Sequence, residues 1–181
     1  MRFIGSITEE DVLKYVEEIH QEEPASTGHI TNRLSEQPKD RSWLLAYLDL
    51  SGEIGTIINR HHHLDQKTGK MLELSNENET WNEATKSFEE RTKDSSWHEC
   101  LERLSNITKK LSEDENFLID RPLLIELVSL KPLKLKHIDG FHRVFAYLRM
   151  ELNQEILCYV VSPLNSTEAL KSYGLGLDAH P

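Results

Sequence analysis

Apolar residues recur along this chain in two rhythms, one of period two and one of period about 3.6, and these predict strands and helices in one protein. After Thr8, a good N-cap with Asp11 at the capping-box position, helical spacing relates four apolar residues: Val12, Tyr15, Val16 and Ile19. A polar break over residues 22–28 and a short helix over 30–34 follow. Residues 1–40 are therefore predicted to form an N-terminal helical extension.

Two apolar segments, Trp43–Leu50 and Ile54–Arg60, flank Ser51-Gly52 and predict a β-hairpin. Three histidines, at 61–63, come next. Adjacent residues cannot all face one way on regular structure. A metal site at these histidines would need ligands from elsewhere, and an exposed loop is the simpler interpretation.

Residues 76–115 are polar overall and predict a helical insertion with one apolar stripe. The stripe is expected to be core and consists of Trp81, Ala84, Phe88, Trp97, Leu101, Leu104, Ile107 and Leu111. Strands are then predicted over 122–130, 133–138 and 156–161, with a helix from 141 between the last two. We expect one α+β domain over residues 1–181, with a small mixed β-sheet and peripheral helices.

The composition, at 29% charged and 38% hydrophobic residues, is typical of a globular protein with a charged surface. No apolar run reaches the roughly 20 residues that span a bilayer, and the first residues lack the apolar core of a signal peptide. We therefore expect a cytoplasmic protein without membrane contact. Cys100 and Cys158 match no metal spacing and are predicted to be free thiols, one on a helix and one in a buried strand.

The net charge of −10 argues against nucleic acid as a partner, because non-specific binding depends on clustered Lys and Arg. A local basic patch is still compatible with the sequence: Lys131, Lys134, Lys136, Arg143 and Arg149 lie close together in the chain. The acidic helical region before them could bind a basic or DNA-binding protein partner.

The segment from Leu133 to Leu148 carries the clearest chemical signal, a strand that ends at Asp139-Gly140 and turns into a helix. Asp139 is predicted to be the N-cap, and Gly140 to let the backbone approach a ligand. The helix dipole and the first amides favour an anion there. Arg143 can bind phosphate oxygens in a fork, and His142 can donate to them. Phe141 and Tyr147 could offer a flat surface to a base.

A reading without ligand explains part of this pattern equally well. Asp139 would be only an N-cap paired with Arg143 on the first turn, an interaction of a few tenths of a kcal/mol. Gly140 would then be an ordinary turn.

Residues 138–148, Ile-Asp-Gly-Phe-His-Arg-Val-Phe-Ala-Tyr-Leu, resemble the Asp-Gly-x-His-Arg box of the ParB/sulfiredoxin-like superfamily. The resemblance covers about 121–162, and the family's first strand is placed at Trp43–Leu50. It implies that Gly140, Phe141, His142 and Arg143 bind a nucleotide, and that Asp139, His142 and Arg143 act in NTP hydrolysis or phosphoryl transfer. Sulfiredoxins carry a reactive cysteine where this chain has Phe141, which excludes that branch, and neither Cys100 nor Cys158 substitutes by position.

Three functions remain open at this point. A small-molecule kinase or NTPase would use ATP or another NTP with magnesium and a carboxylate base, from Asp49, Glu53 or the acidic helices. A ParB-like nuclease would need metal-binding carboxylates and a basic track. A non-catalytic acidic interaction module would need neither. A chromosome-segregation role would require a helix-turn-helix domain after the box, for which only residues to Pro181 remain.

Overall fold

The computed structural model describes residues 1–21, 24–35, 37, 39–49, 52–53, 57, 62–65, 70–73, 79–91, 97–117, 121–130, 133–152 and 154–163. Its main sheet has five strands in the order β1-β2-β7-β5-β6. These strands are β1 (Arg2–Ile7), β2 (Ser42–Asp49), β5 (Leu123–Leu130), β6 (Leu133–Asp139) and β7 (Glu155–Ser162). Only β5 and β7 run parallel; the other neighbours are antiparallel. The architecture is α+β with a mixed sheet, as predicted.

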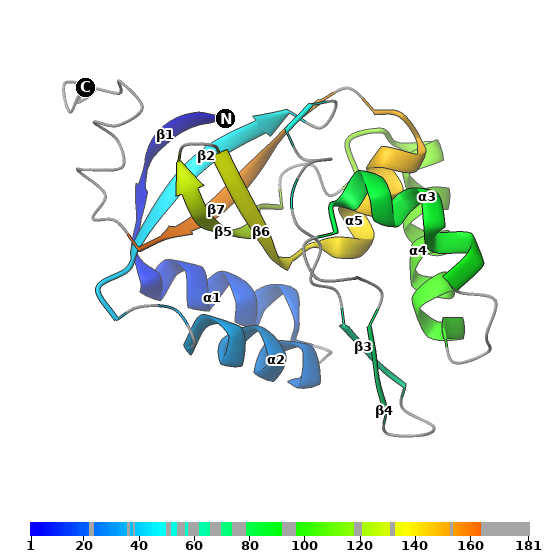
Figure 1. Cartoon of the computed structure of the whole chain (residues 1–181), viewed down its shortest axis with the longest axis horizontal. Coiled ribbons are helices and arrows are strands. Elements are labelled where there is room, and N and C mark those ends of the chain that lie inside the picture. Colours follow the sequence, from blue (N-terminus) through cyan, green and yellow to red (C-terminus); the bar gives the residue numbers. More distant parts are fainter. Residues whose placement is uncertain are drawn as a thin grey trace.

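Helices cover both faces of this sheet (Figure 1). One group consists of α1 (Glu9–Ile19) and α2 (Pro24–Ser35), and the other of α3 (Trp81–Arg91), α4 (His98–Glu113) and α5 (Phe141–Arg149). A separate two-stranded sheet joins β3 (His62–Asp65) and β4 (Lys70–Glu73). Because both faces are covered, the core divides into two apolar clusters with the sheet between them.

The smaller cluster lies under α1 and α2, where Val12, Val16 and Leu34 meet Trp43 and Ile138. The larger cluster joins the other sheet face to α3, α4 and α5, with Trp81 and Phe145 among its buried side chains. Neighbouring residues of β5 therefore enter different clusters: Leu123 and Ile125 belong to the larger one and Leu124 to the smaller one. Along β6, Leu133 and Lys134 at its start are exposed, whereas His137 and Ile138 near its end are both buried.

Several local signals in the sequence act as predicted. The hydroxyl of Thr8 accepts from the backbone N–H of Asp11 at 3.1 Å and begins α1. The region predicted to be helical, 76–115, contains α3 and α4, and most of its apolar stripe is buried. Helix α2 begins at Pro24, earlier than the predicted 30–34, because proline is well tolerated in a first helical turn.

Three predictions about local structure are wrong. Strand β2 does not form a hairpin with the following segment, since β1 and β7 occupy both of its edges; residues 54–56 and 58–60 themselves lie outside the described residues. The extension over residues 1–40 is not wholly helical, because Arg2–Ile7 is the edge strand β1. His62 and His63 belong to β3 and not to a loop, while His61 lies outside the described residues.

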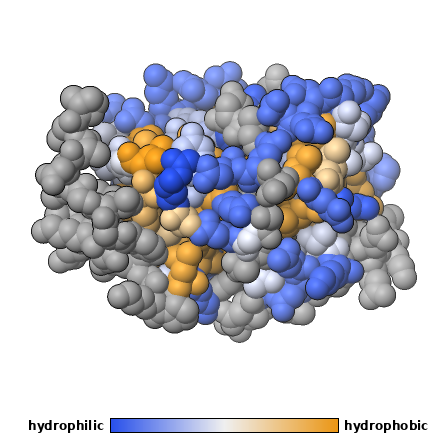
Figure 2. All heavy atoms as spheres, turned by 90° about the horizontal axis from the view of Figure 1, so that it is seen from above, coloured by the Kyte–Doolittle hydropathy of each residue, from blue (hydrophilic) through white to orange (hydrophobic). Residues whose placement is uncertain are grey.

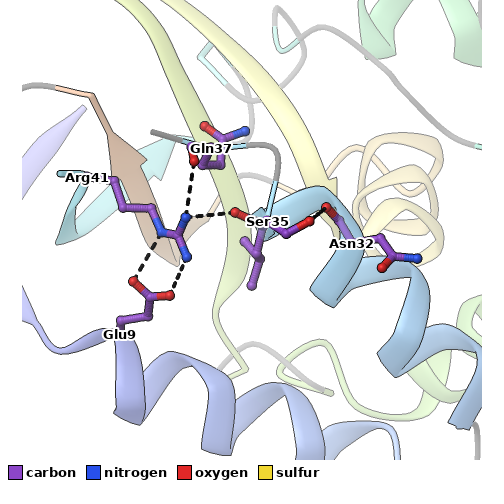
Figure 3. Close-up of polar contacts among 6 residues, drawn as sticks. Glu9, Asn32, Ser35, Gln37 and Arg41 are labelled. Carbon is purple, nitrogen blue, oxygen red and sulfur yellow. Dashed lines mark hydrogen bonds and ion pairs between the residues drawn. The ribbon is translucent and has the colours of Figure 1, made fainter. Parts of the chain in front are cut away.

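The end of α2 is fastened to α1 through Arg41, just before β2 (Figure 3). The Arg41 guanidinium donates to both carboxylate oxygens of Glu9. It also donates to the carbonyls of Leu34, at 2.8 Å, and Gln37, at 3.3 Å. These contacts join the start of α1 to the end of α2 and to the residue that precedes β2.

The surface seen from above is largely hydrophilic, with apolar residues emerging in separate groups (Figure 2). The large apolar side chains that the described residues expose are Ile4, Val128 and Leu133. No helix among these residues combines the length and the apolarity that crossing a bilayer requires.

Candidate functional site

The junction of β6 and α5 contains the predicted box, and Gly140 is its N-cap in place of Asp139. Asp139 is the last residue of β6, and Gly140 has a φ of 103°. The first intrahelical bond runs from the N–H of Val144 to the carbonyl of Gly140 at 3.1 Å. The N-cap lies one residue later than predicted because only glycine adopts this φ without strain, and α5 begins at Phe141 as expected. The positive end of the α5 dipole lies at Gly140.

Gly140 packs closely against two side chains of the protein and not against an open surface where a ligand could lie. A Cβ added there would lie 2.3 Å from Cδ2 of Leu123 and 3.2 Å from Nη2 of Arg143. Leu123 is fully buried at the start of β5. The glycine is therefore required for close packing of the turn against β5, a reason that the sequence pattern did not reveal.

Arg143 points into the protein, and only 8% of it is exposed. Its Nη1 donates to the carbonyl of Arg121 at 2.6 Å, and its Nη2 donates to the carbonyl of Pro122 at 3.0 Å. The hydroxyl of Tyr15 in α1 donates to the same Pro122 carbonyl at 2.8 Å. Arg143 thus ties α5 to the entry of β5, in place of the predicted fork toward a phosphate. Its positive charge still acts on Asp139.

Asp139 has basic neighbours from several elements. Its Oδ2 lies 3.5 Å from Nε2 of His20, at the end of α1, and its side chain is 20% exposed. Burial alone would raise the pKa of Asp139, but the His20 hydrogen bond and the charges of Arg143, His20 and His137 outweigh it and hold this pKa well below its usual range. Asp139 is therefore a carboxylate at neutral pH.

Two arginines from other helices add to this cluster. Arg33 of α2 donates to the carbonyl of Ile138 at 2.9 Å. Arg103 of α4 is exposed, and burial of its guanidinium lowers its pKa while the charge of Asp139 raises it. Neither arginine was singled out in the sequence, because α2 and α4 lie far from the box along the chain. Their positions depend on tertiary packing, for which the sequence gives no local signal.

His142 is half-buried, and its Nε2 lies 3.2 Å from Sγ of Cys100 in α4. From its position in the sequence, Cys100 was not expected near the box, but the fold brings it into contact with His142. Cys100 is nevertheless 1% exposed, and burial raises the pKa of its thiol to about 12. A buried, protonated thiol is a poor nucleophile. Cys158 is also free and lies in the buried strand β7, as predicted.

Phe141 belongs to the core, with 3% of its surface exposed. Its ring centroid lies 5.2 Å from that of Phe145 and 6.3 Å from that of His137. Tyr147 is equally buried and donates its hydroxyl to the Phe117 carbonyl at 2.9 Å. Neither ring presents an open face to a base, in contrast to the prediction for Phe141, because both fill the space between the sheet and α4.

Asp49 and Glu53 lie away from the box. Asp139 is level with Leu124, Tyr159 and Leu45 across the sheet, whereas Asp49 pairs with Glu155 at the far end of β7. Three strand spacings and four residues separate Asp49 from Asp139, or roughly 19 Å. Glu53 accepts from the Asp49 N–H and pairs with the N-terminal amine. Neither can act as a base at the box.

Comparison with protein-family models, curated proteins and solved structures finds no match to this chain. The ParB/sulfiredoxin-like resemblance therefore stays a prediction carried by residues 138–148. Within the described part of the chain, no three His, Cys, Asp or Glu side chains gather closely enough to hold a metal ion together.

Proposed function

We propose that the chain binds a nucleotide through its phosphates at the β6–α5 junction and acts on it by phosphoanhydride hydrolysis or phosphoryl transfer. The observation that carries the proposal is the group of basic side chains around Asp139, which consists of His20, Arg33, Arg103 and Arg143. Its three arginines bring positive charge from α2, α4 and α5 to one place in a chain of net charge −10. Such a concentration at a helix N-terminus favours an anion.

In this proposal some residues contact the phosphate directly, and others act from beneath the turn or bind the metal ion. His142 is half-buried at the first turn of α5 and can donate to a phosphate oxygen, and Arg103, an exposed residue of α4, lies within electrostatic reach of Asp139. Arg143 contributes its charge from beneath the turn. Asp139 supplies an ionised oxygen ligand, which suits Mg²⁺ because this ion is usually held by one or two carboxylates together with substrate phosphates.

The test is a thermal-shift series with ATP, ADP, CTP and GTP, with and without magnesium. A nucleotide at 100 times its dissociation constant stabilises the fold by about 2.7 kcal/mol, which such an assay detects. His142→Ala and Arg103→Ala should reduce the shift. Lys109→Ala is the matched control, because this exposed lysine lies six residues further along α4 and on a different side of the helix.

The absence of a shift with every nucleotide would refute the proposal. If the same protein bound a basic protein tightly, the non-catalytic interaction module would take its place. Cleavage of DNA in the presence of a divalent metal would instead support the nuclease alternative. Phosphate release or phosphoryl transfer by the wild type, reduced in Asp139→Asn, would separate turnover from binding.

A further inference from the structure

The contact between His20 and Asp139 is the place where the end of α1 reaches the box. His20 is the C-cap of α1, and its N–H donates to the Val16 carbonyl at 3.2 Å. Its Nε2 lies 3.5 Å from Oδ2 of Asp139, and the two side chains are 15% and 20% exposed. Strong charge-assisted hydrogen bonds between nitrogen and oxygen are shorter, about 2.7–2.9 Å. The contact is therefore weak, although it places an imidazole beside one oxygen of the carboxylate.

The last turn of α1, residues 17–20, is weakly held in comparison with the middle of this helix. Val12 and Val16 are buried in the smaller core cluster, whereas Glu17 and Glu18 are exposed. This turn carries no Lys or Arg, so its two acidic side chains lie at the negative end of the helix dipole, where negative charge is unfavourable. Segments with few buried contacts open locally at little cost. The His20–Asp139 contact thus fastens a turn that otherwise opens easily.

We propose that residues 17–20 form a latch, which His20 closes on Asp139 and which must open before Asp139 can bind a magnesium ion on a nucleotide. The second part of this statement rests on the proposed function, whereas the first concerns the protein without ligand. The ligands of Mg²⁺ lie at about 2.0–2.1 Å from the ion in an octahedron. The ion and its other ligands therefore need the space around Oδ2 where the His20 ring lies. The contact is autoinhibitory: it is closed without ligand, and its weakness lets the ligand displace it.

Native-state amide hydrogen exchange tests the latch without any ligand. The amide of His20 donates within α1, so it is protected only while the last turn is closed. Asp139→Asn should raise the exchange rates of the amides in residues 17–20 by about two- to fivefold, the range of a weak ion pair, and leave those of residues 12–16 unchanged. His20→Ala should do the same from the other side of the contact. Gln21→Ala is the matched control, because Gln21 is the exposed neighbour of His20.

Unchanged exchange in residues 17–20 of both variants would overturn the proposal. Binding of ATP with magnesium is the second readout. Closure of the latch lowers the apparent affinity in proportion to the fraction of molecules that are open. His20→Ala should therefore bind about two- to fivefold more tightly than wild type, and Gln21→Ala should bind like wild type. Measurable binding that is equal or weaker in His20→Ala would also overturn the proposal. If neither wild type nor His20→Ala binds ATP, the proposed function fails, while the exchange rates still decide whether the latch exists.

Discussion

Gly140→Ala tests how the β6–α5 junction is built. The residue has a φ of 103°, and the added Cβ would lie 2.3 Å from Cδ2 of Leu123. Leu123 is fully buried, so its side chain has no open space into which it could turn. The same Cβ would lie 3.2 Å from Nη2 of Arg143, which already donates to the Pro122 carbonyl.

Two costs add in this variant. A residue with a side chain at this φ costs on the order of 1–3 kcal/mol, and one extra carbon in a packed core costs about 1–3 kcal/mol. The expected loss in the free energy of unfolding is therefore about 2–6 kcal/mol, a large share of the ~5–15 kcal/mol typical of a domain. Urea unfolding should show a lower midpoint with an unchanged slope.

A double-mutant cycle with Leu123→Ala separates the two costs. Leu123→Ala alone should cost about 2–5 kcal/mol. Because it removes the atoms that the new methyl would meet, the double variant should be more stable than additivity predicts by about 1–3 kcal/mol. Gly5→Ala is the control, since an added Cβ there meets nothing within 4 Å. A loss below about 1 kcal/mol in Gly140→Ala, or full additivity with Leu123→Ala, would refute the reasoning.

Three further predictions concern stability, each measured by urea unfolding. Arg143→Met should cost about 2–4 kcal/mol, because buried carbonyls lose their charged donor; a cost below that of exposed Arg149→Met would contradict this. The low pKa of Asp139 stabilises the fold above the unfolded pKa of about 3.9. The difference in free energy of unfolding between wild type and Asp139→Asn should therefore shrink as the pH falls below that value, and a difference that stays constant with pH would contradict this. Arg41→Ala should cost about 1–3 kcal/mol, because the carbonyls of Leu34 and Gln37 lose a donor. Glu9→Gln should cost below about 1 kcal/mol, because the Glu9 side chain is 42% exposed. Equal losses in the two variants would argue against the carbonyl contacts.

The parts of the fold that the sequence predicted well are those with local signals. Strands β5 and β7 follow from apolar runs, β6 from its alternation of apolar and basic residues, and helix α5 from the Asp139-Gly140 turn before it. Thr8 predicted the start of α1 because an N-cap acts within three residues. Strand β1 was missed, since its six residues gain their strand conformation from pairing with β2, about 40 positions away.

At the candidate site, the sequence predicted the local structure of residues 139–143 but not the side chains that other helices bring to it. Residues 139–143 do form a strand end, a glycine turn and a helix start. His20, Arg33, Arg103 and Cys100 reach this place from other helices, through packing that no local pattern encodes. The direction of Arg143 was also unpredictable, because the carbonyls that it binds are exposed as acceptors only by the path of the chain before β5.

The place of β7 in the sheet has a consequence for the order in which the chain folds. This strand comes last in the sequence among the five, yet it lies in the middle, between β2 and β5. Until it inserts, the β1–β2 pair and the β5–β6 hairpin have no common neighbour and cannot share a sheet. During synthesis the β1–β2 pair and the β5–β6 hairpin therefore cannot join before residues 155–162 are made. Until then, the apolar surface that β7 covers is exposed. Closing such distant pairings is slow, and we expect the completed chain, not its growing form, to gain the native sheet.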